Sequence, residues 1–299
     1  MKIINSSVKI LPQEKGVEGM LKHIERVGRL SYRSEERISE ESYERFVKML
    51  KDRGHWAVFN LGAVYLKFHK TNKALVEKFS KHIPFAIIKD NGEDVFVSTD
   101  YRVICQEKLE EVLSKYWVDP DFSDPIQLSL FEPKITTEWE CSRFVAQQVL
   151  RHRAFSPIME SQRYVNYSLE KNELSFIRPE WMKKKDNSYL KDNLNIDTLI
   201  KLRKSVWNEA EAVYKLNIAL GLKPEDARGN LPMDTACKFA FSGFLKDWIK
   251  VPELDSTEKV GFFYLRCAKD AQEDVRVLAS DLQEQFKEYF KKVNYYGVN

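Results

Sequence analysis

The sequence predicts an α+β fold in which a small, mostly antiparallel sheet is covered by long helices. Strand-like alternation of apolar residues is concentrated in the first half of the chain, and the longest helical periodicity lies in the second half. No internal repeat, low-complexity tract or linker divides the 299 residues. This length suits one large domain with an ample core, so we expect a single domain spanning residues 1–299.

The first half is predicted to mix helices with strands. Helical spacing of apolar residues indicates helices over 17–29, 39–53 and 108–117. Alternating patterns indicate strands over 63–68, 95–104 and 134–140. Ser39 is a suitable N-cap for the second helix, and Gly54 is a suitable residue to end it. The turn-rich segment 119–133 is expected to be irregular.

The second half is predicted to be mainly helical. We expect helices over 142–153, over 197–220, from Pro232 to about 249, and over 257–291. Pro157 ends the first of these, while Gly221 and Pro224 end the second. A short strand is expected over 163–168. The last helix should bury a stripe formed by Val275, Leu278, Leu282 and Phe286.

Composition excludes several broad classes of protein. Lys and Arg total 48 against 45 Asp and Glu, so a formal charge of +3 does not indicate a general polyanion binder. No signal peptide or membrane span is predicted, and we expect a cytoplasmic protein with no membrane or nucleic-acid partner. The cysteines have no metal or CxxC spacing and are expected to be packed, reduced thiols at Cys105, Cys141, Cys237 and Cys267.

A local cationic site is instead predicted in the stretch RHRAFSPIMESQRY, residues 151–164. The chain has no GxGxxG motif and no P-loop, so arginine forks are the available means of holding phosphate. Gln148 and Arg151 are spaced to share a helix face, and Ser161 and Arg163 are spaced to point the same way in an extended segment. A turn around Pro157 would let both pairs converge on one anion. The alternative is a solvated helix end, which is the usual role of arginine there.

The spacing of this stretch resembles the signature of the flavin-dependent thymidylate synthases. The resemblance rests on Arg151-His152-Arg153, a seven-residue gap, Ser161, and then Arg163-Tyr164. Three further segments in the same order are similar to that family, namely RGH (53–55), GLKPEDARGNLP (221–232) and LRCAKDAQEDVR (265–276).

The resemblance implies an activity. Members of this family methylate dUMP to dTMP with methylenetetrahydrofolate as the carbon source, NADPH as the reductant and FAD as the working cofactor. It implies an α+β fold and a homotetramer whose active sites lie where subunits meet. It implies no metal ion and no protein nucleophile, because the cofactor carries the difficult chemistry.

The resemblance also implies roles for individual residues. Arg266 matches the catalytic arginine that polarises the pyrimidine and favours ionisation at its N3. The positions that match dUMP contacts are Gln148, Arg151, Met159, Glu160, Ser161, Arg163, Arg228 and Arg266. The positions that match FAD contacts are Arg151, His152, Arg153, Ala57, Asn60 and Lys246.

The flavin positions depart from the family pattern more than the nucleotide positions do. Ala57 stands where the family has a hydroxyl side chain, and Asn60 stands where it has an acidic one. Lys246 keeps only the positive charge of the family's Asn-x-Arg contact. Ile158 and Met159 replace an Asn-Glu pair. Extra length is also expected near 90–135 and 250–260.

Alternatives remain open for the function and for single residues. The chain could perform a related modification such as hydroxymethylation of a pyrimidine nucleotide, or bind nucleotides without catalysis. Without the motif, Arg228 suits the end of a short helix begun by Pro224, and Arg266 is spaced for an exposed ion pair with Asp270. His55 suits an ordinary helix end. An intact Arg266 argues against simple phosphate binding, which needs no group beside the base.

Overall fold

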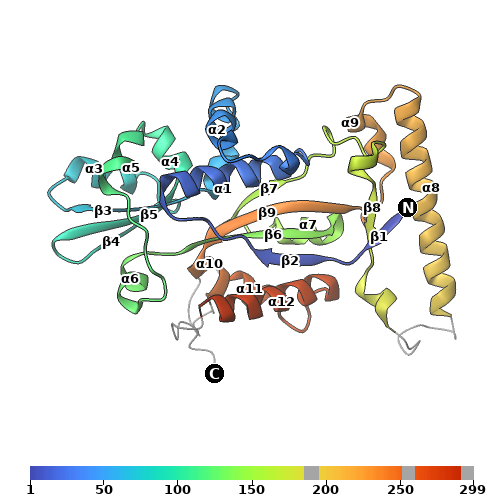
Figure 1. Cartoon of the computed structure of the whole chain (residues 1–299). Helices are drawn as coiled ribbons and strands as arrows, with labels where there is room; N and C mark the ends of the chain where they lie inside the picture. Colours follow the sequence, from blue (N-terminus) through green and yellow to red (C-terminus); the bar gives the residue numbers. More distant parts are fainter. Residues whose placement is uncertain (185–194, 251–259, 291–299) are drawn as a thin grey trace.

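A computed structural model describes residues 1–184, 195–250 and 260–290. A central sheet lies between two helical layers, with a smaller sheet at one end and a long helix at the other (Figure 1). Antiparallel pairing dominates, as predicted for an α+β fold, but the described strands form three sheets rather than one.

The central sheet is antiparallel and has the strand order β2-β6-β9-β7. Its strands are β2 (Ser7–Ile10), β6 (Lys134–Ser142), β9 (Ala236–Phe244) and β7 (Ser156–Met159). β6 and β9 pair along their whole length. Pro157 lies in the edge strand β7, where its missing N–H interrupts no inner ladder. The other edge, β2, is covered by Gln285. Its Nε2 donates to the Val8 carbonyl oxygen, and its Oε1 accepts from the Ile10 N–H.

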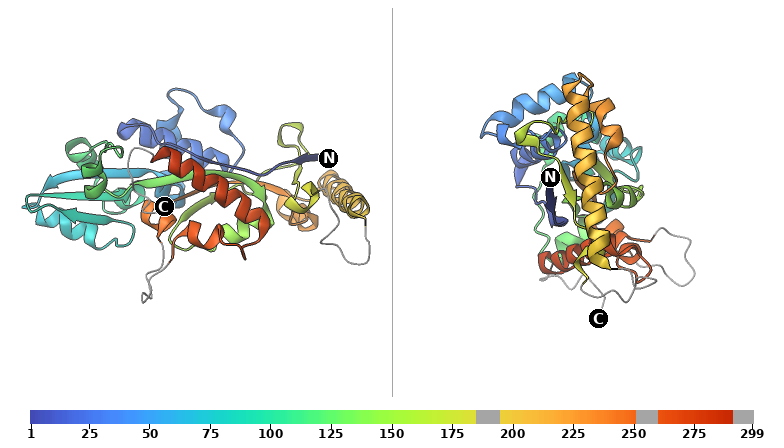
Figure 2. Two further views of the ribbon diagram at one scale, coloured as in Figure 1. Left: turned by 90° about the horizontal axis from the view of Figure 1, so that it is seen from below. Right: turned by 90° about the vertical axis from the view of Figure 1, so that its right-hand side faces the viewer.

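Helices cover both faces of this sheet, as the turned view in Figure 2 also shows. One layer consists of α1 (Gly16–Leu30) and α2 (Ser42–Asp52). The other consists of α7 (Arg143–Val149), α10 (Leu245–Ile249), α11 (Phe262–Arg266) and α12 (Glu273–Tyr289). The second layer shares an aromatic core with the sheet that includes Trp139, Phe241, Trp248, Phe262 and Phe286.

A lobe extends from the central sheet at the left of Figure 1. Its antiparallel sheet has the order β3-β5-β4, formed by β3 (Ala63–His69), β5 (Asp94–Asp100) and β4 (Ile87–Asp90). Its helices are α3 (Lys73–Ser80), α4 (Tyr101–Gln106), α5 (Glu110–Tyr116) and α6 (Pro125–Leu130). The lobe and α1–α2 bury one continuous apolar core.

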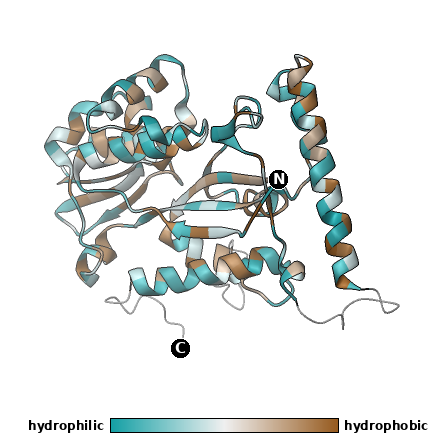
Figure 3. Ribbon diagram, turned by 45° about the vertical axis from the view of Figure 1, so that its right-hand side comes forward, coloured by the Kyte–Doolittle hydropathy of each residue, from teal (hydrophilic) through white to brown (hydrophobic). Residues whose placement is uncertain are grey.

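The opposite end carries β1 (Lys2–Ile4), which pairs in parallel with β8 (Ser175–Ile177), and the helices α8 (Ile196–Ala219) and α9 (Pro224–Ala227). α8 buries Trp207 and Tyr214 against the body. Its other side exposes the large apolar side chains of Leu202, Val206, Leu216 and Leu220. The ribbon of this long helix carries brown segments among teal ones in Figure 3. None of the described helices combines the length and apolar character that a membrane crossing requires.

The structure confirms the helices predicted over 17–29, 108–117 and 197–220 and the strands predicted over 63–68 and 134–140. The second helix exists but begins at Ser42, and Ser39 does not cap it. Instead the Ser39 N–H donates to the Ser42 hydroxyl at 2.8 Å. Gly54 ends this helix with a positive φ of 68°, as glycine permits. All four cysteines are free thiols, of which Cys141 and Cys237 are buried.

Two predictions in the first half were wrong because aspartate caps start helices there. The predicted strand over 95–104 ends at Asp100, whose carboxylate accepts the Val103 N–H at 3.1 Å and opens α4. The segment 119–133 is not wholly irregular, because Asp124 caps α6 with Pro125 in its first turn.

Four predictions in the second half were also wrong. The helix over 142–153 ends at Val149, and residues 163–168 form turns rather than a strand. The run between Pro232 and about 249 is mainly strand β9, which is buried on both faces and so lacks alternation. The last helix is divided, because Gln272 caps a new helix, α12, after α11 has ended. The stripe of α12 is buried as predicted. Residues 257–259 and 291, and most of the extra length predicted near 250–260, lie outside the described residues.

Candidate functional site

Arg266 lies at the end of α11 and is held by two hydrogen bonds to the α7 region. Its Nε donates to His152 Nε2 at 2.7 Å, and its Nη2 donates to the Gln148 carbonyl oxygen at 2.8 Å. That carbonyl belongs to the last turn of α7, where backbone oxygens lack intrahelical partners. The early end of α7 at Val149 therefore creates the acceptor that orients the guanidinium.

His152 is a neutral acceptor in this arrangement. Burial, followed by the nearby Arg266 charge, lowers the pKa of His152 from 6.5 to about 4. The imidazole packs against Phe262, with ring centroids 4.9 Å apart. A neutral ring whose Nε2 accepts from Arg266 carries its proton on Nδ1. The lowered pKa and the hydrogen bond from Arg266 together favour a neutral ring with its proton on Nδ1.

Arg151 is close enough to Arg266 to affect its ionisation. Burial, and next the charge of Arg151, lowers the pKa of Arg266. Arg151 itself is exposed, in the turn that follows α7. Among the described residues, Arg266 Nη1 has no acceptor. Two neighbouring guanidinium groups with spare donors favour an anionic or electron-rich planar ligand between them.

A second group surrounds the turn that begins at Glu160. Glu160 is 2% exposed as a whole residue and forms an ion pair with Arg33, Nε to Oε2 3.0 Å. Its other oxygen, Oε1, accepts a hydrogen bond from the Tyr167 hydroxyl. Burial, and then the adjacent Glu160 charge, raises the pKa of Tyr167 well above its usual value. The carboxylate of Glu160 and its backbone N–H, which donates to the Lys238 carbonyl oxygen at 2.8 Å, are therefore both occupied within the protein.

The loop after α1 holds this turn in place. The Ser161 N–H donates to the Ser31 carbonyl oxygen at 2.9 Å, and the Tyr32 and Tyr164 rings lie 5.8 Å apart. Arg33, in the same loop, has a positive φ of 47°, which is uncommon for a residue with a side chain. Three successive loop residues thus contact three residues of the motif.

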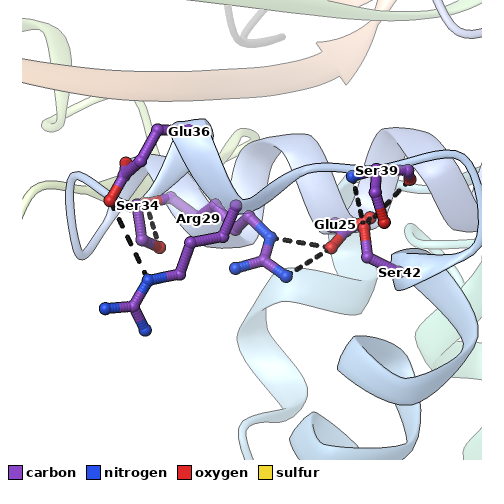
Figure 4. Close-up of polar contacts among 7 residues, drawn as sticks. Glu25, Arg29, Ser34, Glu36, Ser39 and Ser42 are labelled. Carbon is purple, nitrogen blue, oxygen red and sulfur yellow. Dashed lines mark hydrogen bonds and ion pairs between the residues drawn. The ribbon is translucent and has the colours of Figure 1, made fainter.

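The loop itself is anchored by a buried carboxylate, shown in Figure 4. Glu25 on α1 is 1% exposed and accepts from Arg29, Nη2 to Oε1 2.6 Å, and from the Ser42 hydroxyl at 2.8 Å. Ser42 begins α2, so both ends of the loop are tied to the same side chain. Sequence reasoning missed Arg33 and Glu25. The acidic Glu160 inside a cationic motif indicates that it pairs with a cation. The sequence does not show which of the 48 Lys and Arg residues that cation is.

The remaining arginines predicted to bind nucleotide lie apart from Arg266. Arg163 is exposed and lies over the Tyr164 ring, 5.3 Å from its centroid. Arg228 directly follows α9, and its Nε donates to the Glu225 carbonyl oxygen at 3.2 Å. In Figure 1, α9 lies beside α8 at one end of the molecule and α11 lies below the central sheet.

Two expectations about this geometry were wrong. Gln148 and Arg151 do not share a helix face, because the helix ends between them, and Ser161 and Arg163 lie in a turn rather than an extended segment. The described residues show no ion pair between Arg266 and Asp270. Arg228 does end a short helix begun by Pro224.

The predicted flavin positions lie on three different elements. Ala57 and Asn60 lie in the 3-10 helix Trp56–Leu61, and Asn60 also lines a pocket of about 360 Å³ in the lobe. Lys246 is exposed on α10, and Arg153 is exposed after α7. The part of the chain that the structure describes holds no group of three His, Cys, Asp or Glu side chains placed to bind a metal ion.

A fixed guanidinium beside a second arginine and a neutral histidine is an arrangement suited to an anion attached to a polar ring. The family model described as "Thymidylate synthase complementing protein" matches residues 102–290, which is more than half of the chain. The chain belongs to this family.

Curated relatives carry the name flavin-dependent thymidylate synthase. The protein of that name from Synechocystis is 28% identical over 169 residues, covering 55% of this chain and 72% of the relative. The one from Pyrococcus furiosus is 31% identical over 145 residues, covering 48% of this chain and 50% of the relative. The aligned part thus spans only half the length of the Pyrococcus protein.

Two solved structures of the UMP/dUMP methylase PolB from Streptomyces cacaoi are similar to this chain along most of its length. The complex with 5-Br UMP has 11% identity and a TM-score of 0.42, covering 96% of this chain and 92% of that one. The complex with 5-Br dUMP has 13% identity and a TM-score of 0.40, covering 98% and 93%.

Proposed function

We propose that this protein methylates dUMP to dTMP reductively, using methylenetetrahydrofolate, NADPH and FAD. The observation that carries the proposal is Arg266, which two hydrogen bonds hold beside Arg151 and a neutral His152. Simple phosphate binding does not require such a fixed fork. Membership of the family and the names of the curated relatives support the same reaction.

Arg266 has the catalytic role in this proposal. Its guanidinium stays charged and lies beside a carbonyl of the pyrimidine, where it stabilises negative charge as N3 loses its proton. His152 and the Gln148 carbonyl keep the fork in place before the substrate arrives, so little reorganisation is needed during the reaction. Arg151 binds the nucleotide beside it.

The nucleotide is held further by the Glu160–Arg163 turn and by Arg228. The Ser161 hydroxyl and the arginine forks are suitable donors for phosphate oxygens. Arg33 and Tyr167 position this turn through Glu160 without touching the substrate.

The residues present suit a flavin dinucleotide. Arg151, Arg153 and Lys246 supply positive charge for its diphosphate, and Asn60 lines a cationic pocket. When bound, the flavin supplies the hydride and carries the one-carbon unit. The chain's own residues bind and orient the nucleotide.

We also propose a homotetramer with active sites at subunit interfaces. Arg228 follows α9, which lies beside α8 at one end of the molecule, whereas α11 with Arg266 lies below the central sheet in Figure 1. This arrangement supports a site completed by a second copy. The apolar outer side of α8 offers a surface for such contacts. The single domain and the cytoplasmic location stay predictions.

Tritium release from dUMP labelled at C5 tests the reaction, with FAD, NADPH and methylenetetrahydrofolate present. We expect tritium release together with dTMP, identified by chromatography. Omission of methylenetetrahydrofolate should prevent dTMP formation. Hydroxymethyl-dUMP in place of dTMP would support the alternative modification, and a colourless protein that stays inert with added FAD would refute the enzyme reading.

A further inference from the structure

We propose that the pocket between α1 and residues 38–40 binds a small organic ammonium ion, which donates a hydrogen bond to His23. The pocket has a volume of about 420 Å³, within the usual range for ligand sites. Its walls come from α1, from Pro12 and Glu14 before it, and from residues 38–40 before α2. Its lining in the described chain includes none of the predicted nucleotide or flavin positions, so this inference does not depend on the proposed function.

His23 brings an unused acceptor to the wall of this pocket. The residue is 4% exposed, and its Nε2 has no hydrogen-bond partner among the described residues. A hydrogen bond joins the ring to the Pro12 backbone. Because proline has no N–H, the ring donates this bond from Nδ1, which leaves Nε2 as an acceptor. Burial, and then the Arg26 charge, lowers the pKa of His23 from 6.5 to about 4, so the ring is neutral near pH 7.

The pocket runs along the face of α1 that carries this imidazole. Gly19, His23 and Arg26 are one turn apart on the helix, and all three line the pocket. A Cβ at Gly19 would clash with the Glu14 carbonyl oxygen. Glycine at this position therefore lets the segment before α1 pack against the helix and close one side of the pocket. A buried acceptor without a partner is unfavourable, and a ligand with an N–H donor relieves that cost.

The two cations in the lining already have acidic partners. Lys22 pairs with Glu18, one turn earlier on α1, at 2.8 Å. Arg26 faces Glu138 of β6 at 3.8 Å. The lining cations are therefore already opposed by carboxylates, which disfavours an anionic ligand.

The lining carboxylates are only partly neutralised. Glu25 is paired with Arg29 at 2.6 Å. Glu14 and Glu40 are exposed and form no ion pair among the described residues. A primary ammonium ion meets both requirements, because its N–H groups donate to His23 Nε2 and its charge is attracted to these two carboxylates. Exposed charges contribute little each, so the hydrogen bond to the buried imidazole carries most of the affinity.

The wall opposite α1 is fixed before any ligand binds. The Ser39 N–H donates to the Ser42 hydroxyl at 2.8 Å, and that hydroxyl donates to Glu25 Oε2 at 2.8 Å. Ile38 lines the pocket and is 44% exposed, which offers apolar surface to a short alkyl chain. A preformed pocket lowers the entropic cost of binding.

Probes with one butyl chain and different head groups distinguish the ligand classes. Butylammonium has a charge and N–H donors, 1-butanol has a donor without charge, and butyrate has the opposite charge. Saturation-transfer NMR with the whole chain measures the dissociation constant of each probe. The variants are H23F, which keeps a ring without an acceptor, and E14Q/E40Q, which keeps the size of both side chains. E44Q removes an exposed carboxylate of α2 outside the pocket and is the control.

We expect butylammonium to bind about tenfold more tightly than either 1-butanol or butyrate. H23F should weaken butylammonium binding by about tenfold, the effect of one charge-assisted hydrogen bond. E14Q/E40Q should weaken it by about threefold, as expected for exposed charges, and should leave 1-butanol binding unchanged. E44Q should change none of the constants.

Circular dichroism of each variant shows whether it is folded, and E14Q/E40Q decides the result if H23F is not. An unchanged constant for butylammonium in folded H23F, or in E14Q/E40Q, would overturn the inference. Tighter binding of butyrate than of butylammonium would also contradict it. If no probe binds saturably, water or a neighbouring copy fills the pocket and the proposed ligand site does not exist.

Discussion

Replacing Arg266 by alanine is expected to lower tritium release from dUMP by about two to three orders of magnitude, the usual cost of removing a preorganised donor beside developing charge. The guanidinium is fixed by His152 and the Gln148 carbonyl before substrate binds, so its loss removes a ready-made electrostatic contact. Flavin absorbance of the purified variant should remain, which would show that the cofactor still binds.

Lysine at this position gives the sharper comparison. R266K keeps the positive charge but cannot make the two hydrogen bonds from one rigid plane, so most of the turnover should still be lost. R45A, which removes an exposed arginine of α2, is the matched control and should keep wild-type turnover. Wild-type turnover in both R266A and R266K would remove the catalytic assignment.

Replacing Glu160 by leucine is expected to lower the free energy of unfolding by about 3–5 kcal/mol, because it leaves a buried charge without its partner. Arg33 pairs with Glu160 in a site where the Arg33 side chain is 17% exposed and the Glu160 side chain is 0% exposed. Burial lowers the pKa of Arg33, but the charge and hydrogen bond of Glu160 together with Tyr167 and Glu140 outweigh burial, so the pKa is raised. Urea denaturation followed by circular dichroism measures the change.

The double variant R33M/E160L distinguishes the effect of an unpaired buried charge from the effect of changed side-chain packing. It removes both charges, so it should recover much of the stability lost in E160L. Because the pair positions the Ser161–Arg163 turn, the double variant should still raise the KM for dUMP more than it lowers kcat. A loss in E160L of only about 1 kcal/mol, typical of exposed pairs, would contradict the structural role.

The sequence predicted elements well where one physical signal dominated. α8 and α12 show helical spacing over many residues, and β3 and β6 show alternation. β9 was mistaken for a helix because both of its faces are buried, which removes the alternation that marks a strand. α4 was hidden because its apolar residues continue those of β5, and only the cap at Asp100 marks the change.

For the candidate site, the sequence supplied the residues but not their partners. The Arg266–His152 hydrogen bond joins residues 114 positions apart, and no local pattern predicts such a pairing. Glu160 was assigned to the nucleotide through the backbone of the 159–163 loop, and the sequence did not indicate that its carboxylate pairs with Arg33 and accepts from Tyr167. His23 and Glu40 belong to no motif, and only the fold brings them to one pocket.

We propose that Arg266 of one copy and Arg163 of another copy enclose a single bound nucleotide. Coexpression of R266A with R163A, under different affinity tags, tests it in the purified mixed oligomer. Random assembly should restore tritium release to about one quarter of the wild-type value, because some sites receive both intact arginines from different copies. If the mixed oligomer is as inactive as either variant alone, both arginines act from the same chain and the claim is contradicted.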